Sequence, residues 1–507
     1  MTRCGRRALT AAVALLLADA AHASASKDDL ARERRLASRV SRDRALEMVK
    51  RLVTEGPRMG GTPSGDRAAA LVAAWLKEAG LPVDVVDDPP RLVHEETAWT
   101  VELAGKPLAS AWPYGYSPSL PLAAYPIALD DALPAEGAQP GKPLAGRVLL
   151  TSRGLEVLKP AAEAGAVAVL TDHPADPNRF VDWAPIVEIP RMLRQQGKEA
   201  AIPMFGLSYR DGQALRTAAA AAPLTVSISL VSSVREGRPR TVIATLAGAG
   251  ARREEVVLVC AHGDSDSGGP GADDNASGVA ALIELARALA QAAAAGELPS
   301  DRPQVRFAVW GSELHSSHAY IRSHEAELAR HLAVFNYDQA GFGSARDALY
   351  YEGNDVPWNA PLLRTLESIA GDHAGQSGFW TIHTSNPSLG GTDMYVFLPQ
   401  RYQGTASTDL KIPVTTVFTA AWDRPTIVEQ TPGWQSAGWP ETGPLFVDYS
   451  AYYHSSGDRP ERTTEVEPHN MERCARLVLL SILRLMEGRA VSAPTPATAP
   501  VPPPSPR

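Results

Sequence analysis

Histidine and carboxylate residues recur after apolar segments in the second half of the chain. His262 and Asp264 follow one such segment, Glu313 follows the next, Asp338 follows a third, and His454 lies in a loop before the last expected helix. Imidazole nitrogen and carboxylate oxygen are ligands that zinc takes in proteins, and a catalytic zinc site keeps one position open for water or substrate. These residue types in this order therefore indicate a metal site suited to hydrolysis.

A pair of carboxylates, Asp273 and Asp274, lies within the segment Pro270–Gly278, which reads Pro-Gly-Ala-Asp-Asp-Asn-Ala-Ser-Gly. One carboxylate can bridge two zinc ions held about 3.5–4 Å apart, a separation that suits hydrolases. Asp264, two residues after His262, is placed to orient that imidazole. A carboxylate that is not a ligand is also required, because a general base must take a proton from water and pass it to the leaving amine.

Each of these signals has an ordinary structural alternative. A His-x-Asp after a strand can be structural, an Asp-Asp-Asn at the start of a helix can be an N-cap, and Glu313 alone can be a surface residue. Their order along successive apolar segments favours the metal site, because ligands bind beyond the carboxyl ends of the strands in open α/β sheets.

The elements around these residues can place them on one rim of a sheet. Continuous apolar runs are typical of strands that are buried on both faces. Such strands are expected at Val256–Cys260, Val305–Trp310, Leu332–Tyr337 and Val414–Phe418. Apolar residues repeat on one helical face within Ser277–Ala294, and a last helix is expected from about His469 to Met486. The alternation predicts an α/β domain with a mainly parallel, mixed sheet flanked by helices.

The chain divides by composition and pattern into five segments. We expect a signal peptide at 1–25, an N-terminal segment packed on the catalytic domain at 26–114, an inserted module of α+β or β type at 115–230, a catalytic domain at 231–488 and a proline-rich tail at 489–507. The insert is inferred from a change to short strands and short helices. It has no cluster of histidine and acidic residues beside strand ends, so we expect no catalytic residue there.

Composition and charge restrict the partners and the compartment. The 507 residues are 44% hydrophobic and 21% charged, with a net charge of −8, which is typical of a soluble globular protein. The negative charge disfavours nucleic acid and anionic membranes as partners, because both select basic patches. A basic start, a short apolar run at Ala8–Ala18 and small residues before Ser26 form the pattern of a secretory signal peptide. We therefore expect a periplasmic or secreted protein without a membrane anchor, in which Cys260 and Cys474 are buried free thiols.

Residues 235–488 resemble the co-catalytic di-zinc exopeptidases, the family of the secreted bacterial aminopeptidases and plasma glutamate carboxypeptidase. The motifs that carry the resemblance are His-x-Asp-Ser, Pro-Gly-Ala-Asp-Asp-Asn-Ala-Ser-Gly, Trp-x-Ser-Glu, Asn-Tyr-Asp and His-Ser-Ser-Gly-Asp. The resemblance implies two zinc ions, with His262 and Asp338 on one, His454 on the other and Asp274 bridging both. It also implies that Glu313 is the general base and that a cis peptide bond follows Asp274.

The residue after Glu313 departs from the family pattern. The family usually has a second acidic residue there as a zinc ligand, whereas this chain has Leu314 in a segment that is shortened. His315 is the nearest imidazole and is a candidate substitute ligand. A competing registration makes Glu313 the zinc ligand and leaves no base. We prefer Glu313 as the base, because a one-residue slip would reverse the side chains of the preceding strand.

The resemblance extends beyond the catalytic domain. Residues 115–230 resemble a protease-associated domain, Gly56-Pro57-Arg58 resembles the N-terminal segment of carboxypeptidase-like members, and 390–393 resembles a loop that lines the pocket, with Asp393 as a candidate pocket residue. The implied activity is hydrolysis of terminal residues of peptides or dipeptides by metal-activated water, with an aminopeptidase favoured. Two alternatives stay open, namely a catalytically inactive binding protein on this fold and a single-zinc acyltransferase of the glutaminyl cyclase type.

Overall fold

The structure is a computed structural model that describes residues 25–133, 143–177, 180–189, 201–265, 268–343, 348–353, 357–386, 392–397, 411–419 and 452–489. The expected signal peptide and proline-rich tail lie outside the described residues except for Ala25 and Arg489, and so do Gly390 and Gly391 of the expected pocket loop.

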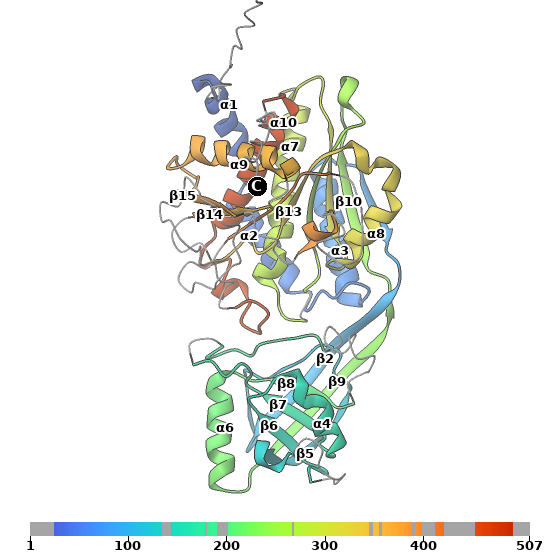
Figure 1. The fold of residues 1–507 in the computed structure, drawn as a ribbon, viewed down its shortest axis with the longest axis vertical. Coiled ribbons are helices and arrows are strands. Elements are labelled where there is room, and N and C mark those ends of the chain that lie inside the picture. The colour runs from blue at the N-terminus through green and yellow to red at the C-terminus, as the bar shows by residue number, and fades with distance from the viewer. Residues whose placement is uncertain are drawn as a thin grey trace, which may run out of the picture.

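The larger of two modules is built on an eight-stranded mixed sheet (Figure 1). Across the sheet the order is β1 (Val83–Asp87), β10 (Arg240–Leu246), β12 (Gln304–Trp310), β11 (Val256–His262), β13 (His331–Tyr337), β16 (Val414–Phe418), β14 (Ala348–Glu352) and β15 (Ile382–Asn386). The central strands β12, β11, β13 and β16 are parallel, and antiparallel pairs occur at β1–β10, β10–β12 and β14–β16. All four expected strands lie at this parallel centre, which confirms the predicted fold class.

Apolar layers cover both faces of this sheet. The helices of the first layer are α1 (Lys27–Ala37), α2 (Arg42–Val53), α3 (Pro63–Glu78), α7 (Gly278–Ala294), α9 (Ala360–His373) and α10 (Asn470–Met486). Their buried residues belong to one apolar cluster with Val257 and Val259 of β11. On the other face, α8 (His315–Ser323) and the short helix η7 (Asp393–Phe397) pack on Leu258 and Cys260. Successive residues of β11 thus enter opposite layers, as the pleat of a strand requires. Cys260 and Cys474 are buried free thiols, as expected.

Helix α7 lies inside the first layer. From the sequence we expected no stretch able to span a membrane, yet among the described residues the helical segment Ala272–Ala294 meets that test by length and composition. Because 78% of its most apolar window is buried in the protein, this is weak evidence for a membrane span. Its apolar residues serve as the core contacts of the sheet.

The second module, at the bottom of Figure 1, has its own eight-stranded sheet. The order is β3 (Lys106–Pro107), β2 (Arg91–Leu103), β9 (Thr225–Gly237), β5 (Leu120–Leu129), β6 (Val148–Thr151), β7 (Ala168–Thr171), β8 (Met204–Gly206) and β4 (Trp112–Pro113), with helices α4 (Leu158–Glu163) and α6 (Tyr209–Ala221). Strands β2 and β9 pair from Arg91 and Gly237 down to Leu103 and Val226, and they connect this module to the catalytic sheet. The module thus extends on both sides beyond the expected 115–230. Strands β2 and β3 precede residue 115, and β9 continues to Gly237.

Candidate metal centre

Three of the expected ligands meet at the carboxyl end of the parallel strands. His262 is the last residue of β11 and is 1% exposed. Its Nε2 atom lies 3.3 Å from Asp274 Oδ1 and 3.5 Å from Asp338 Oδ1. One ligand atom from each of these residues lies within 4.8 Å of the other two, so the group could hold a metal ion. Asp338 reaches it because it follows β13, which is the parallel neighbour of β11.

Asp274 lies between two imidazoles. It belongs to the irregular turn η4 (Ala272–Ser277), which joins the end of β11 to α7. Its Oδ1 faces His262, and its Oδ2 lies 3.2 Å from His454 Nε2. The peptide bond between Asp274 and Asn275 is cis, as the resemblance implied. A carboxylate whose two oxygens face different imidazoles is arranged to bridge two cations.

The charges of these residues fit a bound cation. Burial raises the pKa of Asp274, but hydrogen bonds to His262 and His454 outweigh burial and hold that pKa below its usual range. Asp338 Oδ1 is buried and receives no hydrogen bond from any described residue. A buried oxygen without a donor is unfavourable, and a cation would satisfy it. The donor set of imidazole nitrogens and carboxylate oxygens is one that zinc takes.

Asp264 connects the metal ligands to the loop after β12. Its Oδ1 lies 3.2 Å from His262 Nδ1, so it can orient the ring from behind. The same carboxylate accepts the backbone N–H of Glu313, at 3.1 Å to Oδ1 and 3.2 Å to Oδ2. The position of Glu313 is thus tied to that of His262 through one buried side chain.

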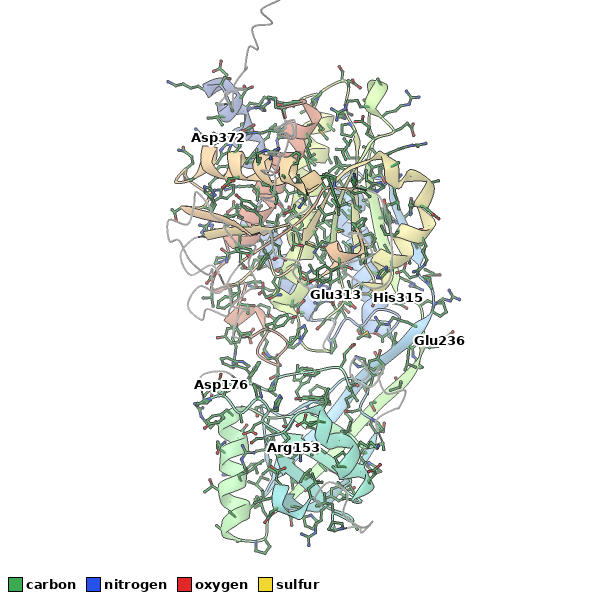
Figure 2. The ribbon with its side chains drawn as sticks, viewed as in Figure 1. Arg153, Asp176, Glu236, Glu313, His315 and Asp372 are labelled. Atoms are coloured by element: carbon green, nitrogen blue, oxygen red, sulfur yellow. The ribbon has the colours of Figure 1, made fainter. Side chains whose placement is uncertain are left out.

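Glu313 is half-buried in the turn between β12 and α8. Figure 2 shows it, together with His315, at the edge of the larger module that faces the second sheet. The next residue, Leu314, has a positive φ of 57°, and its N–H donates to Asp393 Oδ1 at 2.8 Å. Two buried carboxylates therefore hold two successive amides of this turn.

Asp393 is expected from the sequence to be a candidate pocket residue, and the structure places it beneath the turn instead. It is fully buried, and its Oδ1 also accepts the Ser317 hydroxyl at 2.5 Å. Burial raises the pKa of Asp393 to about 7. Its contacts with Leu314 and Ser317 support the loop of Glu313.

The structure does not bring His315 to the metal ligands. Its Nε2 lies 2.8 Å from the backbone oxygen of Pro89, on the far side of the turn. The group that could hold a metal contains His262, Asp274 and Asp338. The shortened loop begins α8 at His315, and the start of a helix directs this side chain toward the strand connection that contains Pro89.

Two residues that support the ligands have no role predicted from the sequence. Arg58 is fully buried and donates to the backbone oxygens of Gly263, Pro270 and Gly271, at 3.1, 2.8 and 2.7 Å. These oxygens belong to the loops that follow His262 and precede Asp274. The only signal in the sequence is the Gly-Pro-Arg loop, which does not reveal its distant partners.

Asp458 supports the ligands from the loop of His454. Its two carboxylate oxygens accept the N–H groups of Asp273 and Asp274, at 2.8 and 2.9 Å. Burial raises the pKa of Asp458 to about 7. The signal in the sequence was the Asp that ends His-Ser-Ser-Gly-Asp. The contact fixes the backbone on which the bridging carboxylate stands.

A parallel-centred sheet with a shared aspartate between two histidines at its carboxyl edge defines the class of zinc exopeptidases. The sequence profile of peptidase family M28 matches residues 241–482. This part of the chain is therefore similar to family M28, as the resemblance of its motifs predicted.

Curated relatives of known name are 28% and 29% identical to this chain over the residues that match. Aminopeptidase YwaD of Bacillus subtilis is 28% identical over 302 residues, which are 56% of this chain and 59% of the relative. The probable lipoprotein aminopeptidase LpqL of Mycobacterium tuberculosis is 29% identical over 322 residues, 60% of each protein. The chain thus spans about three fifths of the length of these relatives.

Solved structures share the fold over most of the chain. The peptidase M28 precursor from Shewanella amazonensis superposes with a TM-score of 0.61 at 19% identity, covering 94% of this chain and 99% of that one. BSAP, a zinc aminopeptidase from Bacillus subtilis, has a TM-score of 0.55 at 21% identity, covering 88% of this chain and 95% of that one. The second module is included in this coverage, so both modules belong to the shared architecture.

Proposed function

We propose that this protein is a zinc-dependent exopeptidase that removes terminal residues from peptides or dipeptides, with an aminopeptidase favoured. The observation that carries the proposal is the position of Asp274, whose two oxygens face His262 and His454. The relatives named aminopeptidases support this activity.

In this proposal the centre takes two zinc ions. His262, Asp338 and one oxygen of Asp274 would hold the first ion, and His454 and the other oxygen of Asp274 would hold the second. Leu314 offers no ligand atom, so among the described residues fewer side chains would hold the second ion than the first. Bound zinc would polarise the scissile carbonyl and lower the pKa of water.

Glu313 acts as the general base. It accepts a proton from the attacking water and delivers it to the leaving amine, which is the work that a carboxylate outside the ligand set can do. Asp264 accepts the Glu313 N–H, and Asp393 accepts the N–H of the next residue. Both carboxylates therefore restrain the turn that carries the Glu313 side chain. Asp264 has the additional role of orienting His262.

The geometry disfavours two other functions on this fold. An inactive binding protein would not need a shared carboxylate between two imidazoles, and a single-zinc acyltransferase would not need His454 opposite the second oxygen of Asp274. The zinc content of the purified protein, together with turnover of free and N-blocked dipeptides, separates all three. An aminopeptidase cleaves the free dipeptides and leaves the blocked ones intact.

The remaining proposals concern location and the second module. We propose that the protein is exported to the periplasm or the medium, on the basic and apolar pattern of its first 25 residues. The names of two similar proteins contain the words lipoprotein and precursor, which fits export of those proteins. We also propose that the second module is protease-associated in type and carries no catalytic residue.

The test of the mechanism is Glu313→Gln. The amide has nearly the same shape but cannot take a proton, so turnover should fall by about 100- to 10,000-fold, the usual range for loss of a general base. Zinc content, measured by elemental analysis, should stay unchanged. His315→Ala in the same turn is the matched control and should keep both zinc and turnover, because its ring bonds to Pro89.

The outcomes separate the two registrations of this turn. Loss of one equivalent of zinc in Glu313→Gln would show that Glu313 is a ligand, and the assignment would be reversed. Loss of zinc in His315→Ala would make His315 the substitute ligand after all. If the wild-type protein bound no zinc, or if it cleaved no peptide, the proposed function itself would be refuted.

A further inference from the structure

A short strip of the second module, residues Trp183–Glu188, lies against the loop that carries His454. Its backbone forms an antiparallel bridge at Pro185 and Ser455. The N–H of Ile186 donates to the backbone oxygen of His454 itself, at 2.7 Å. The second module therefore contacts a proposed metal ligand directly through its main chain.

Further hydrogen bonds extend this contact by one residue. Ser456 N–H donates to the Ala184 oxygen at 2.9 Å, and Ala184 N–H donates to the Ser456 hydroxyl at 3.0 Å. His454 has a φ of 48°, in the left-handed region that non-glycine residues seldom adopt. Such a conformation persists when its surroundings hold it, and the strip supplies part of that hold.

Aromatic packing closes the same interface. The Trp183 ring lies 4.4 Å from the Tyr452 ring, centroid to centroid. Gly457 lies so close to Trp183 that a Cβ atom there would come within 2.7 Å of the indole. The indole therefore occupies the space beside the His454 loop and limits its movement.

The strip is itself anchored in the second module. Gly115 N–H donates to the Val187 backbone oxygen at 3.0 Å, and Ile189 N–H donates to the Gly115 backbone oxygen at 3.1 Å. Glu188 lies 3.2 Å from His94, which belongs to β2. The strip is thus held by hydrogen bonds to the rest of the second module. Through the strip, the His454 loop is bonded to that module.

Among the described residues, the other proposed ligands are held by the catalytic domain. His262 and Asp338 follow strands of the catalytic sheet, and the amide of Asp274 is held by Asp458. Asp458 ends the His454 loop but bonds within the catalytic domain. In the described part of this loop, the strip supports the backbone from His454 to Ser456.

We propose that the second module is a positioning element for His454, and that through this residue it sets the affinity of the second zinc ion without changing that of the first. The proposal rests on the proposed two-zinc function. It assigns to Trp183 and its neighbours a role in the metal centre, although none of them is a proposed ligand.

The test is Trp183→Ala, with zinc affinity measured by competition against a chelator and the ligand geometry followed by the absorption of Co²⁺-loaded protein. We expect the second ion to bind about 10- to 100-fold more weakly, as is usual when a group supporting a ligand is lost, and the first ion to stay within twofold. Trp183→Phe keeps a ring against Tyr452 and should restore most of the affinity. Trp99→Ala is the matched control, because it removes a tilted ring contact with Trp112 within the module at a similar centroid distance of 4.7 Å.

A milder variant keeps the test valid if Trp183→Ala does not fold. Ser456→Ala removes the hydroxyl that accepts the Ala184 amide and should weaken the second ion severalfold in the same direction. Two ions bound at wild-type affinity in both variants would overturn the inference, and so would equal weakening of both ions. Wild-type protein that holds only one ion would refute the two-zinc proposal instead, before any variant is compared.

Discussion

Replacing Arg58 by methionine should weaken both the fold and the metal centre. Arg58 is 1% exposed and bonds to three backbone oxygens in the two loops around His262 and Asp274. Burial lowers its pKa to about 10, against the opposing effect of Asp458, so the guanidinium remains charged at neutral pH. Methionine fills a similar space but donates to none of the three oxygens, and of these the Gly271 oxygen keeps the Ala276 N–H as a donor at 3.2 Å.

The magnitude follows from these three bonds. A hydrogen bond that involves a charged group contributes roughly 1.5–3 kcal/mol, so at the lower value the three come to about 4.5 kcal/mol. Removing a buried charge returns part of its desolvation cost, and the expected loss in free energy of unfolding is therefore about 3 kcal/mol. Because the loops carry His262 and Asp274, zinc affinity should fall by about tenfold or more.

The assay is urea unfolding of the zinc-free protein followed by circular dichroism, so that ligand binding does not add to the measured stability. Arg67→Met is the control, since Arg67 pairs with Glu55 at 2.7 Å with its side chain 57% exposed. Exposed pairs contribute about 0–1 kcal/mol. If Arg58→Met and Arg67→Met differed by less than about 1 kcal/mol, with equal zinc affinity, the reasoning would be refuted.

Two further predictions concern pH. Burial raises the pKa of Glu33, but hydrogen bonds from His373 and Arg484 outweigh it and lower the pKa from 4.5 to about 2. The resulting stability, about 3 kcal/mol, is present above pH ~4.5 and lost as the pH falls toward 2, so Glu33→Gln should flatten the acid side of a series of urea unfolding curves. Burial lowers the pKa of His94, but the carboxylates of Glu96 and Glu188 outweigh burial and raise the pKa from 6.5 to about 10. That stability is complete below pH ~6.5 and lost as the pH rises toward 10, so His94→Gln should remove the alkaline slope. A slope that survives in either variant would contradict the corresponding prediction.

The parallel strands and the order of the site residues could be predicted because their signals are local. A buried strand requires a continuous apolar run, and β11, β12, β13 and β16 each have one. The ligands follow these strands, so parallel pairing alone brings His262 and Asp338 to one edge. Once the strands are parallel, a residue at the end of its own strand lies at that edge of the sheet. Its position along the strand is a local property of the sequence.

The roles of His315 and Asp393 could not be derived in this way. His315 lies two residues after Glu313, yet the start of α8 directs its ring to Pro89. Asp393 lies beside glycines in a loop-like segment, yet it is buried under the turn of Leu314. In both cases the side-chain direction depends on which element packs against the turn, and the residue type does not encode that.

The fold class, the shared aspartate and the histidines that face it could be predicted from the amino-acid sequence, because each is indicated by a local run or motif of residue types. The contacts that hold those ligands in place became apparent only in the folded protein. Arg58 bonds to Gly271 across 213 positions of the chain, and the Ala184 amide bonds to Ser456 across 272. Contacts over such separations arise when whole elements pack together, and no local pattern of residue types records them.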